Sequence, residues 1–319
     1  MKTVTILIPC YNEAQSLTVL HEEIIRVISS LEDYAWEILF VNDGSHDNTM
    51  EVIHALREKD LRVSYVDLSR NFGKENAMLA GLDYAKGDAV VIMDADLQHP
   101  PAVIPELIRK WEEGYDDVYA QRKGRGRESW LRKKLTKFYY RLLQNSSRMD
   151  VLPNVGDFRL LDRKCVDALR QMRESGRYTK GMYCFIGFKK TGVEFETQDR
   201  ASGKSSMSYR KLVNLALEGI TSYTTVPLRW ATFIGIIVSL FAFAYMVFVL
   251  VKAILFGDPV AGYPTLITVV LFLGGVQLLT IGIIGEYLAK VFLEVKNRPV
   301  YFVREYKGSE EIVAYEKDK

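Results

Sequence analysis

The first hundred residues alternate between short apolar runs and amphipathic stretches. The apolar runs have strand length and end in turn residues, and the stretches between them repeat apolar positions at helical spacing. The predicted strands cover 4–8, 36–41, 63–68 and 89–93, and the predicted helices cover 14–30, 48–59, 74–84 and 101–113. This alternation is typical of an α/β fold with a mostly parallel sheet covered on both faces.

The pattern changes near residue 230. Two runs, 230–251 and 263–285, contain no charged residue. Each is long enough to cross a hydrocarbon core of about 30 Å as a helix, whereas a buried helix of a soluble protein usually keeps a polar stripe. Because only a short linker joins the runs, a transmembrane hairpin is favoured over a pair of buried core helices.

Basic residues lie on one side of this predicted hairpin. The linker carries only Lys252, while basic residues flank the hairpin at Arg210, Lys211, Arg229, Lys290, Lys296 and Arg298. The positive-inside rule therefore predicts that both termini are cytoplasmic. The chain also opens on a strand, with neither a basic region nor a cleavage site before it, so we expect no secretory signal.

These patterns predict the domain organisation. We expect a cytoplasmic α/β domain over 1–208, with a basic interfacial segment at 122–148. An interfacial helix at 209–224 would lead into transmembrane helices at 228–252 and 263–287, and 288–319 would form a cytoplasmic tail.

Composition excludes some classes. The 319 residues carry a formal net charge of +2, and the three cysteines show no metal-ligand spacing and argue against a disulfide framework. The first strand is not followed by Gly-x-Gly-x-x-Gly, and no Gly-Lys-Ser/Thr loop occurs. A dinucleotide oxidoreductase or a P-loop enzyme is therefore disfavoured.

Polar residues follow each of the four predicted strands. In parallel sheets, ligands bind beyond the carboxyl ends of the strands. The segments that meet there are 9–13, 42–45, 69–74 and 94–98. Asp94 and Asp96, with Gln98, offer the hard oxygen ligands that Mg²⁺ or Mn²⁺ takes together with substrate phosphates. The alternative for the acidic pair is a solvated turn after a buried strand.

The segment 122–148 is strongly basic. It holds ten lysine and arginine residues against one acid, Glu128, with aromatic residues interleaved. The spacing predicts an amphipathic helix at a membrane surface. A solvated basic helix and a nucleic-acid site are the alternatives. The apolar runs downstream favour the membrane, so we expect no nucleic-acid partner.

The strings Ile8-Pro9-Cys10-Tyr11-Asn12-Glu13, Asn42-Asp43-Gly44-Ser45 and Asp94-Ala95-Asp96-Leu97-Gln98-His99-Pro100-Pro101 carry a resemblance. They resemble the family-2 glycosyltransferases of the GT-A fold, and within them the dolichol-phosphate mannose synthase group. With the two apolar runs, the chain is most similar to the bacterial bactoprenol (undecaprenyl-phosphate) glucosyltransferases. The resemblance covers nearly the whole chain.

The resemblance implies a function. The chain would transfer a hexose, first of all glucose from UDP-glucose, to a polyprenyl phosphate at the cytoplasmic face of a bacterial inner membrane. The reaction would depend on Mg²⁺ or Mn²⁺ and invert the anomeric carbon, and the protein would be a homo-oligomer such as a tetramer. The chemistry of the acceptor is consistent with this function, because a phosphate monoester is already ionised near neutral pH and can attack the anomeric carbon without a strong base.

The resemblance also assigns residues. The catalytic set is Asp94, Asp96 and Asp157, and the metal set is Asp94, Asp96 and Gln98. The nucleotide sugar would be held by Pro9, Tyr11, Asn12, Glu13, Asp43, Lys74, Asp94, Ala95, Asp96, Arg200, Lys204 and Ser205. The acceptor phosphate would contact Arg122 and either Arg132 or Lys133.

Asp157 has a local alternative among these assignments. Asp157 would orient the acceptor or act as a base, and its alternative is to cap the helix predicted from Arg163. The segment 200–206 resembles a mobile loop that closes over a diphosphate, with its glycine and serine residues supplying mobility and Arg200 and Lys204 supplying charge.

Four other functions share part of the pattern. GDP-mannose would serve a mannosyltransferase, and an aminoarabinose-type transferase would share every motif. A catalytically inactive membrane scaffold would keep the fold alone. A processive polysaccharide synthase carries Gln-x-x-Arg-Trp, but here Val226 stands at the glutamine position before Arg229 and Trp230.

Overall fold

The computed structural model describes residues 1–123, 155–196, 226–256 and 262–309. The chain divides into two compact units. One contains the described residues 1–123, 155–196 and 298–309, and the other contains 226–256 and 262–297. The predicted segments 209–224 and 288–319 fall wholly or in part outside the described residues, as does nearly all of 122–148.

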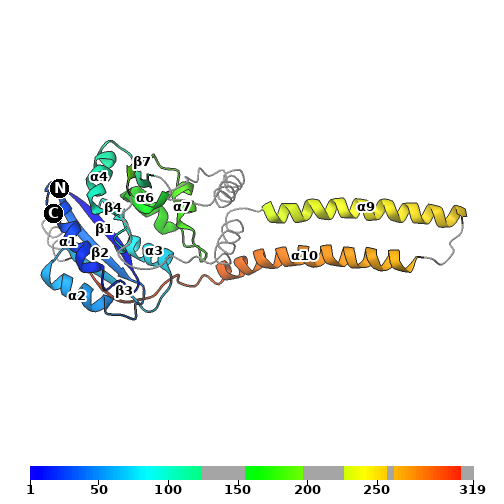
Figure 1. Cartoon of the computed structure of the whole chain (residues 1–319), viewed down its shortest axis with the longest axis horizontal. Helices are drawn as coiled ribbons and strands as arrows, with labels where there is room; N and C mark the ends of the chain where they lie inside the picture. Colours follow the sequence, from blue (N-terminus) through cyan, green and yellow to red (C-terminus); the bar gives the residue numbers. More distant parts are fainter. Residues whose placement is uncertain (124–154, 197–225, 257–261, 310–319) are drawn as a thin grey trace. The chain divides into compact units, whose positions relative to one another are not determined.

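The first unit is built on one eight-stranded sheet with helices on both faces (Figure 1). The strand order is β7-β5-β6-β4-β1-β2-β3-β8. Its centre consists of β1 (Lys2–Cys10), β2 (Tyr34–Asn42), β3 (Val63–Leu68) and β4 (Ala89–Ile92), all parallel. These strands are buried almost throughout, because helices cover both faces, and this explains their continuous apolar runs.

The helices that follow the central strands confirm the predicted alternation. They are α1 (Leu17–Ile28), α2 (Thr49–Lys59) and α3 (Lys74–Tyr84), and, after β4, the short 3-10 helix η1 (Pro101–Val103) and α4 (Ile104–Glu112). Helices α1, α2 and α4 pack on one face of the sheet, around Ile6 and Phe40. Helix α3 packs on the other face, against Leu7 and Leu39, together with later helices.

The flanks of the sheet make it mixed. Strand β6 (Val155–Asp162) runs antiparallel to both β4 and β5 (Asp117–Arg122), and β7 (Lys190–Phe195) runs parallel to β5. Helices α6 (Arg163–Gln171) and α7 (Thr179–Phe185) lie between β6 and β7 in the chain. At the opposite edge, β8 (Val303–Lys307) runs antiparallel to β3.

The second unit contains two long helices, α9 (Val226–Phe256) and α10 (Tyr263–Val295). Large apolar side chains are exposed along both, Phe241 and Leu278 among them. Within the described residues, one segment, 272–295, is long and apolar enough to cross a membrane, and a shorter apolar helical segment covers 230–245. Helix α10 continues to Val295, past the predicted end at 287.

Candidate active site

The carboxyl ends of β1 and β2 are tied together by their loops. The Asn12 backbone N–H donates to Ser45 Oγ at 3.0 Å, and the His46 backbone N–H donates to Asn12 Oδ1 at 2.9 Å. Asn12 has a φ of 56°, which asparagine tolerates better than most residues. The Tyr11 side chain projects from this junction and is 42 % exposed. A flat aromatic surface beside a polar turn is suited to a nucleotide base.

Asp43 fixes the loop that follows β3. Its two carboxylate oxygens accept the backbone N–H groups of Phe72 at 2.7 Å and Gly73 at 2.9 Å. Burial raises the pKa of Asp43, against the opposing effect of these two hydrogen bonds and of the Arg70 charge. Sequence reasoning assigned Asp43 to the base and ribose. In the structure both of its oxygens hold the protein's own backbone.

The glycine beside Asp43 permits this close approach. Gly44 has a φ of 64°, and a Cβ there would lie 2.3 Å from the Arg70 carbonyl carbon. Only glycine fits a left-handed position in such contact with a neighbouring backbone. Gly44 of the Asn-Asp-Gly-Ser sequence is therefore needed for packing as well as for turning the chain.

Asp94 and Asp96 follow β4 in a tight turn. The Gln98 backbone N–H donates to Asp96 Oδ1 at 3.1 Å, and Leu97 has a φ of 62°. The Asp94 backbone N–H donates to His99 Nδ1 at 3.0 Å. His99 is buried and stacks on Phe158, with ring centroids 4.8 Å apart.

His99 thus supports the turn from behind, a role that sequence reasoning did not assign to it. Burial lowers the pKa of His99, against the raising effect of the Asp94 charge. A neutral imidazole whose Nδ1 accepts the Asp94 backbone N–H fixes the peptide that leads into the acidic turn. The His-Pro-Pro sequence after Asp-Leu-Gln was the only available signal.

Lys74 connects this turn to β6. Its Nζ lies 2.6 Å from Asp94 Oδ1 and 2.9 Å from Asp157 Oδ2. Burial would raise the pKa of Asp157, but the charge and hydrogen bond of Lys74 hold it below the ordinary value. The second oxygen, Asp157 Oδ1, is buried without a hydrogen-bond partner among the described residues. Asp157 therefore has one oxygen held by Lys74 and a second, buried oxygen whose hydrogen bonding the described residues leave unsatisfied.

The helix-capping alternative for Asp157 is wrong. Asp162 is the residue before α6, and its carboxylate accepts the Lys164 backbone N–H at 3.1 Å. Asp157 instead lies near the start of β6, five residues earlier, where it faces Lys74.

Glu75 is a further carboxylate that sequence reasoning missed. Its Oε2 accepts the backbone N–H of Thr179, the first residue of α7, at 3.1 Å. Burial and the neighbouring charge of Asp157 raise the pKa of Glu75 to about 7. Thr179 Oγ1 and the Tyr183 hydroxyl are buried nearby without hydrogen-bond partners in the described part of the chain. The Asp157 side of the site is thus rich in polar groups.

The residues at the strand ends fit a divalent cation by their chemistry. Asp94, Asp96 and Gln98 offer carboxylate and amide oxygens, the ligand type that Mg²⁺ and Mn²⁺ select. Burial raises the pKa of Glu13, and the charges of Asp96 and Asp94 add to this effect. The edge therefore concentrates negative charge that a cation would relieve. Over 1–123, 155–196, 226–256 and 262–309, no three acidic, histidine or cysteine side chains form a ready cluster, so substrate oxygens would complete the set.

Several predicted residues contribute little to this geometry or cannot be placed. Pro9 lies near the end of β1, and Ala95 lies between the two acids of the turn after β4 and is buried. Arg122 ends β5 and is exposed, aligned with Phe195 of β7. The predicted residues that lie outside the described ranges are Arg132, Lys133, Arg200, Lys204 and Ser205.

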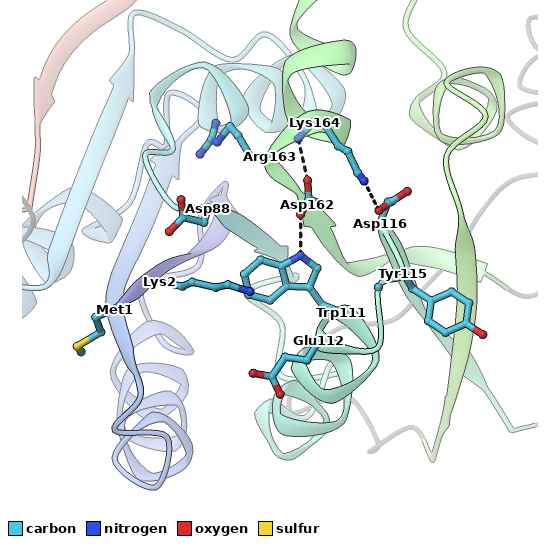
Figure 2. A pocket seen from close by; sticks show the side chains of 11 residues that line it. Met1, Lys2, Asp88, Trp111, Glu112, Tyr115, Asp116, Asp162, Arg163 and Lys164 are labelled. Carbon is cyan, nitrogen blue, oxygen red and sulfur yellow. Dashed lines mark hydrogen bonds and ion pairs between the residues drawn. The ribbon is translucent and has the colours of Figure 1, made fainter.

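A wide polar groove lies at the amino ends of the central parallel strands, at the other end of these strands from the candidate site (Figure 2). Its lining includes Lys2, which begins β1, and Trp111 of α4. Trp111 Nε1 donates to Asp162 at 2.7 Å, and Lys164 pairs with Asp116 at 2.6 Å. These side chains already form hydrogen bonds and ion pairs with one another. Because the groove lies where the central strands begin and the candidate site lies where they end, the two are separate.

Comparison with known proteins identifies the family. Residues 5–170 match the model of glycosyl transferase family 2, which is more than half of the chain. The chain belongs to glycosyl transferase family 2. Residues 226–291 of this glycosyltransferase match a second model, the GtrB C-terminal hairpin.

Curated relatives match along nearly the full length of the glycosyltransferase. An uncharacterized glycosyltransferase of Synechocystis is 44% identical over 306 residues, covering 96% of each chain. A protein named SfII prophage-derived bactoprenol glucosyl transferase, of Shigella flexneri, is 42% identical over 301 residues. That match covers 94% of this chain and 97% of the relative.

A solved structure shares the fold of the glycosyltransferase. Glucosyl-3-phosphoglycerate synthase of Mycobacterium tuberculosis, crystallised with Mn²⁺, UDP and glucosyl-3-phosphoglycerate, matches with a TM-score of 0.50 at 18% identity. The match covers 69% of this chain and 78% of that one. The mixed-sheet α/β domain is therefore GT-A-like.

Proposed function

We propose that this glycosyltransferase moves glucose from UDP-glucose to a polyprenyl phosphate at the cytoplasmic face of a bacterial inner membrane. The observation that carries the proposal is the junction at Lys74, whose ammonium joins Asp94 of the acidic turn to Asp157 of β6. The acceptor and the sugar are supported by the Shigella relative, which is named a bactoprenol glucosyl transferase.

The strand ends would bind the donor. Tyr11 would stack on the base, and the hydrogen bond from the Asn12 backbone N–H to Ser45 Oγ would shape the pocket for the nucleoside. Asp94, Asp96 and Gln98 would hold Mg²⁺ or Mn²⁺, which when bound supplies Lewis-acid stabilisation of the departing diphosphate. Lys74, exposed over 44% of its side chain, would donate to a diphosphate oxygen.

The transfer would be a single displacement. An acceptor phosphate oxygen forms the bond to the anomeric carbon, and the bond from that carbon to the diphosphate breaks, so that its electron pair leaves with UDP. A displacement of this kind inverts the anomeric carbon. Since the acceptor oxygen is already ionised, Asp157 is not required to remove a proton. Its Lys74-bound carboxylate would fix the ammonium between the two phosphorylated substrates.

We also propose that α9 and α10 form a transmembrane hairpin with both termini cytoplasmic. The exposed apolar side chains of both helices and the match to the GtrB hairpin model support this topology. The domain boundaries follow from it: a catalytic domain to 208, an interfacial helix, two spans and a tail. The homo-oligomer, a tetramer for example, stays a prediction.

The test is transfer to a defined lipid. Membranes that contain the full chain are incubated with undecaprenyl phosphate, Mg²⁺ or Mn²⁺, and radiolabelled UDP-glucose, GDP-mannose or a UDP-aminoarabinose derivative in separate reactions. We expect label in the lipid fraction from UDP-glucose. Label from another donor would replace the sugar assignment, and label from none would reject the transferase proposal in favour of the scaffold.

A further inference from the structure

The strand β8 belongs to the sheet of the catalytic domain although it follows the apolar helix α10 in the chain. Helix α10 ends at Val295, and eight residues later β8 begins its antiparallel pairing with β3. Strand β3 leads into the loop 69–73, and that loop leads into Lys74. The chain that returns from the hairpin therefore lies directly beside the strand that positions the site lysine.

The pairing of β8 with β3 contains a bulge at Arg304. Val303 pairs with Leu68 and Glu305 pairs with Asp67, so Arg304 is the additional residue. Bulges re-aim side chains and are common beside active sites. Here Arg304 Nη1 lies 3.1 Å from the buried Asp67 carboxylate, and Nη2 donates to the Ser69 carbonyl at 2.9 Å. The guanidinium thus holds both the end of β3 and the first residue of the loop.

Asp67 connects Arg304 to the Asn-Asp-Gly-Ser turn at the end of β2. Its Oδ1 accepts the Asn42 side-chain N–H at 2.7 Å, and Asn42 Oδ1 accepts the Ser45 backbone N–H at 3.2 Å. Both Asn42 and Asp67 are buried. Polar groups at low dielectric hold one another in place more firmly than exposed ones. Arg304 is therefore one end of a chain of hydrogen bonds that ends in the Asn-Asp-Gly-Ser turn.

The loop 69–73 is held from two sides. Phe302 accepts the Ser69 backbone N–H through its carbonyl at 2.9 Å, and its ring lies 6.3 Å from the ring of Phe72. From the other side, Asp43 accepts the N–H groups of Phe72 and Gly73. Phe302 and Arg304 therefore hold the start of the loop at Ser69, while Asp43 holds its end at Phe72 and Gly73.

Strand β8 also covers the edge of β3, and it does so through contacts other than those of Arg304. The antiparallel pairing of the two strands covers the edge, and the Tyr65 hydroxyl donates to Glu305 at 2.7 Å. Arg304 has no partner residue in the pairing with β3, since it is the bulge residue. Its two contacts are directed at Asp67 and the loop.

We propose that Arg304 is a positioning residue for the donor site. It acts through Asp67 and Ser69, so that the strand returning from the hairpin keeps the loop 69–73, and with it Lys74, in the conformation that binds the nucleotide. This inference rests on the proposed function, which assigns the strand ends to the nucleotide-sugar donor.

Hydrogen exchange of the full chain in detergent, without substrate, tests the conformational part. In Arg304→Ala we expect exchange of the Phe72 and Gly73 amides to accelerate about tenfold. Arg304→Lys, which can keep the ion pair with Asp67, should restore part of the protection. Tyr65→Phe is the matched control, because it removes a side-chain hydrogen bond between the same strands without touching the loop. Unchanged exchange in Arg304→Ala, or equal acceleration in Tyr65→Phe, would overturn the proposal.

Nucleotide affinity tests the functional part. UDP and GDP are titrated with Mn²⁺ into the wild type and each variant. The dissociation constant of the nucleotide that the wild type binds is then compared among the proteins. We expect about tenfold weaker binding in Arg304→Ala and none of this loss in Tyr65→Phe. A looser loop with unchanged affinity would reduce Arg304 to a structural residue. If the wild type binds neither nucleotide, the proposed function fails, and the exchange experiment alone decides whether Arg304 holds the loop.

Discussion

The ammonium of Lys74 lies 2.9 Å from the carboxylate of Asp157, although the two residues are 83 positions apart in the chain. The first opens α3 and the second lies in β6, which pairs with β4 at the centre of the sheet. Lys74 also contacts Asp94, which belongs to the proposed donor site. It therefore joins the proposed donor site to the polar groups around Asp157.

Replacement of Lys74 tests that connection. In Lys74→Met the Asp157 carboxylate loses its cation, so the pKa of Asp157 should rise and the transfer rate should fall about 100-fold or more. Lys74→Arg keeps the charge and should retain more activity. Initial rates with UDP-glucose and undecaprenyl phosphate measure the effect. A Lys74→Met enzyme with near wild-type rates would remove Lys74 from the site.

Replacement of Asp96 tests the metal assignment. Asp96→Ala should abolish transfer while the protein still fractionates with membranes, because the site lies in the sheet domain and not in the apolar helices. It should also lose Mn²⁺ binding in the presence of UDP, measured by electron paramagnetic resonance. EDTA should stop the wild-type reaction, and added Mn²⁺ or Mg²⁺ should restore it.

Asp116→Asn provides the control for Asp96. Asp116 is paired with Lys164 in the groove at the amino ends of the central parallel strands. Its replacement also removes a carboxylate from the domain, but it should leave both Mn²⁺ binding and transfer unchanged. Equal losses in the two variants would mean that general charge, and not a site at Asp96, attracts the ion.

Glu75 should make stability depend on pH. Its pKa is about 7 in the folded protein against an ordinary value of 4.5, so the folded state binds more protons than the unfolded state between these values. Stability should therefore fall as pH rises from about 4.5 to 7. Glu75→Gln stays neutral and can still accept the Thr179 N–H. The variant should gain thermal stability relative to the wild type as pH rises, by up to about 3 kcal/mol above pH 7.

Thermal midpoints of both proteins at pH 5 and pH 8 measure this dependence. The difference between them should be small at pH 5 and favour Glu75→Gln at pH 8. A difference that is constant across the range would mean that Glu75 has the same charge in the folded and unfolded states.

Two glycines separate backbone strain from steric contact. Gly44 and Gly114 both have positive φ, but a Cβ at Gly114 meets nothing within 4 Å, whereas one at Gly44 overlaps the Arg70 backbone. Gly114→Ala should cost about 1 kcal/mol of stability, and Gly44→Ala about 2 kcal/mol or more. Gly44→Ala should also weaken nucleotide binding, since the displaced backbone leads to Lys74. Equal thermal midpoints for the two variants would contradict this account.

The central fold could be predicted from sequence because its signals are local. The strand 63–68 and the helix 74–84 were predicted with the bounds that the structure shows, since turn residues separate them from each other and from their neighbours. The strands β5, β6, β7 and β8 were not predicted. Strand β8 shows why: Val-Arg-Glu-Tyr-Lys is short and largely polar, and only pairing with β3 makes it a strand.

By itself the sequence determined that acids and amides would follow the central parallel strands, although it gave no sign of Glu75. Acids and amides directly after buried parallel strands must share one edge of a sheet, so Asp94, Asp96, Asn12 and Asp43 could be assigned to one place. Only the tertiary structure decided how these groups are used. It gives the Asp43 carboxylate to a backbone loop, fixes Lys74 between Asp94 and Asp157, and brings Arg304 to the end of β3. The reason is physical: periodicity encodes local burial, whereas contacts between distant segments depend on pairing and packing that no local pattern specifies.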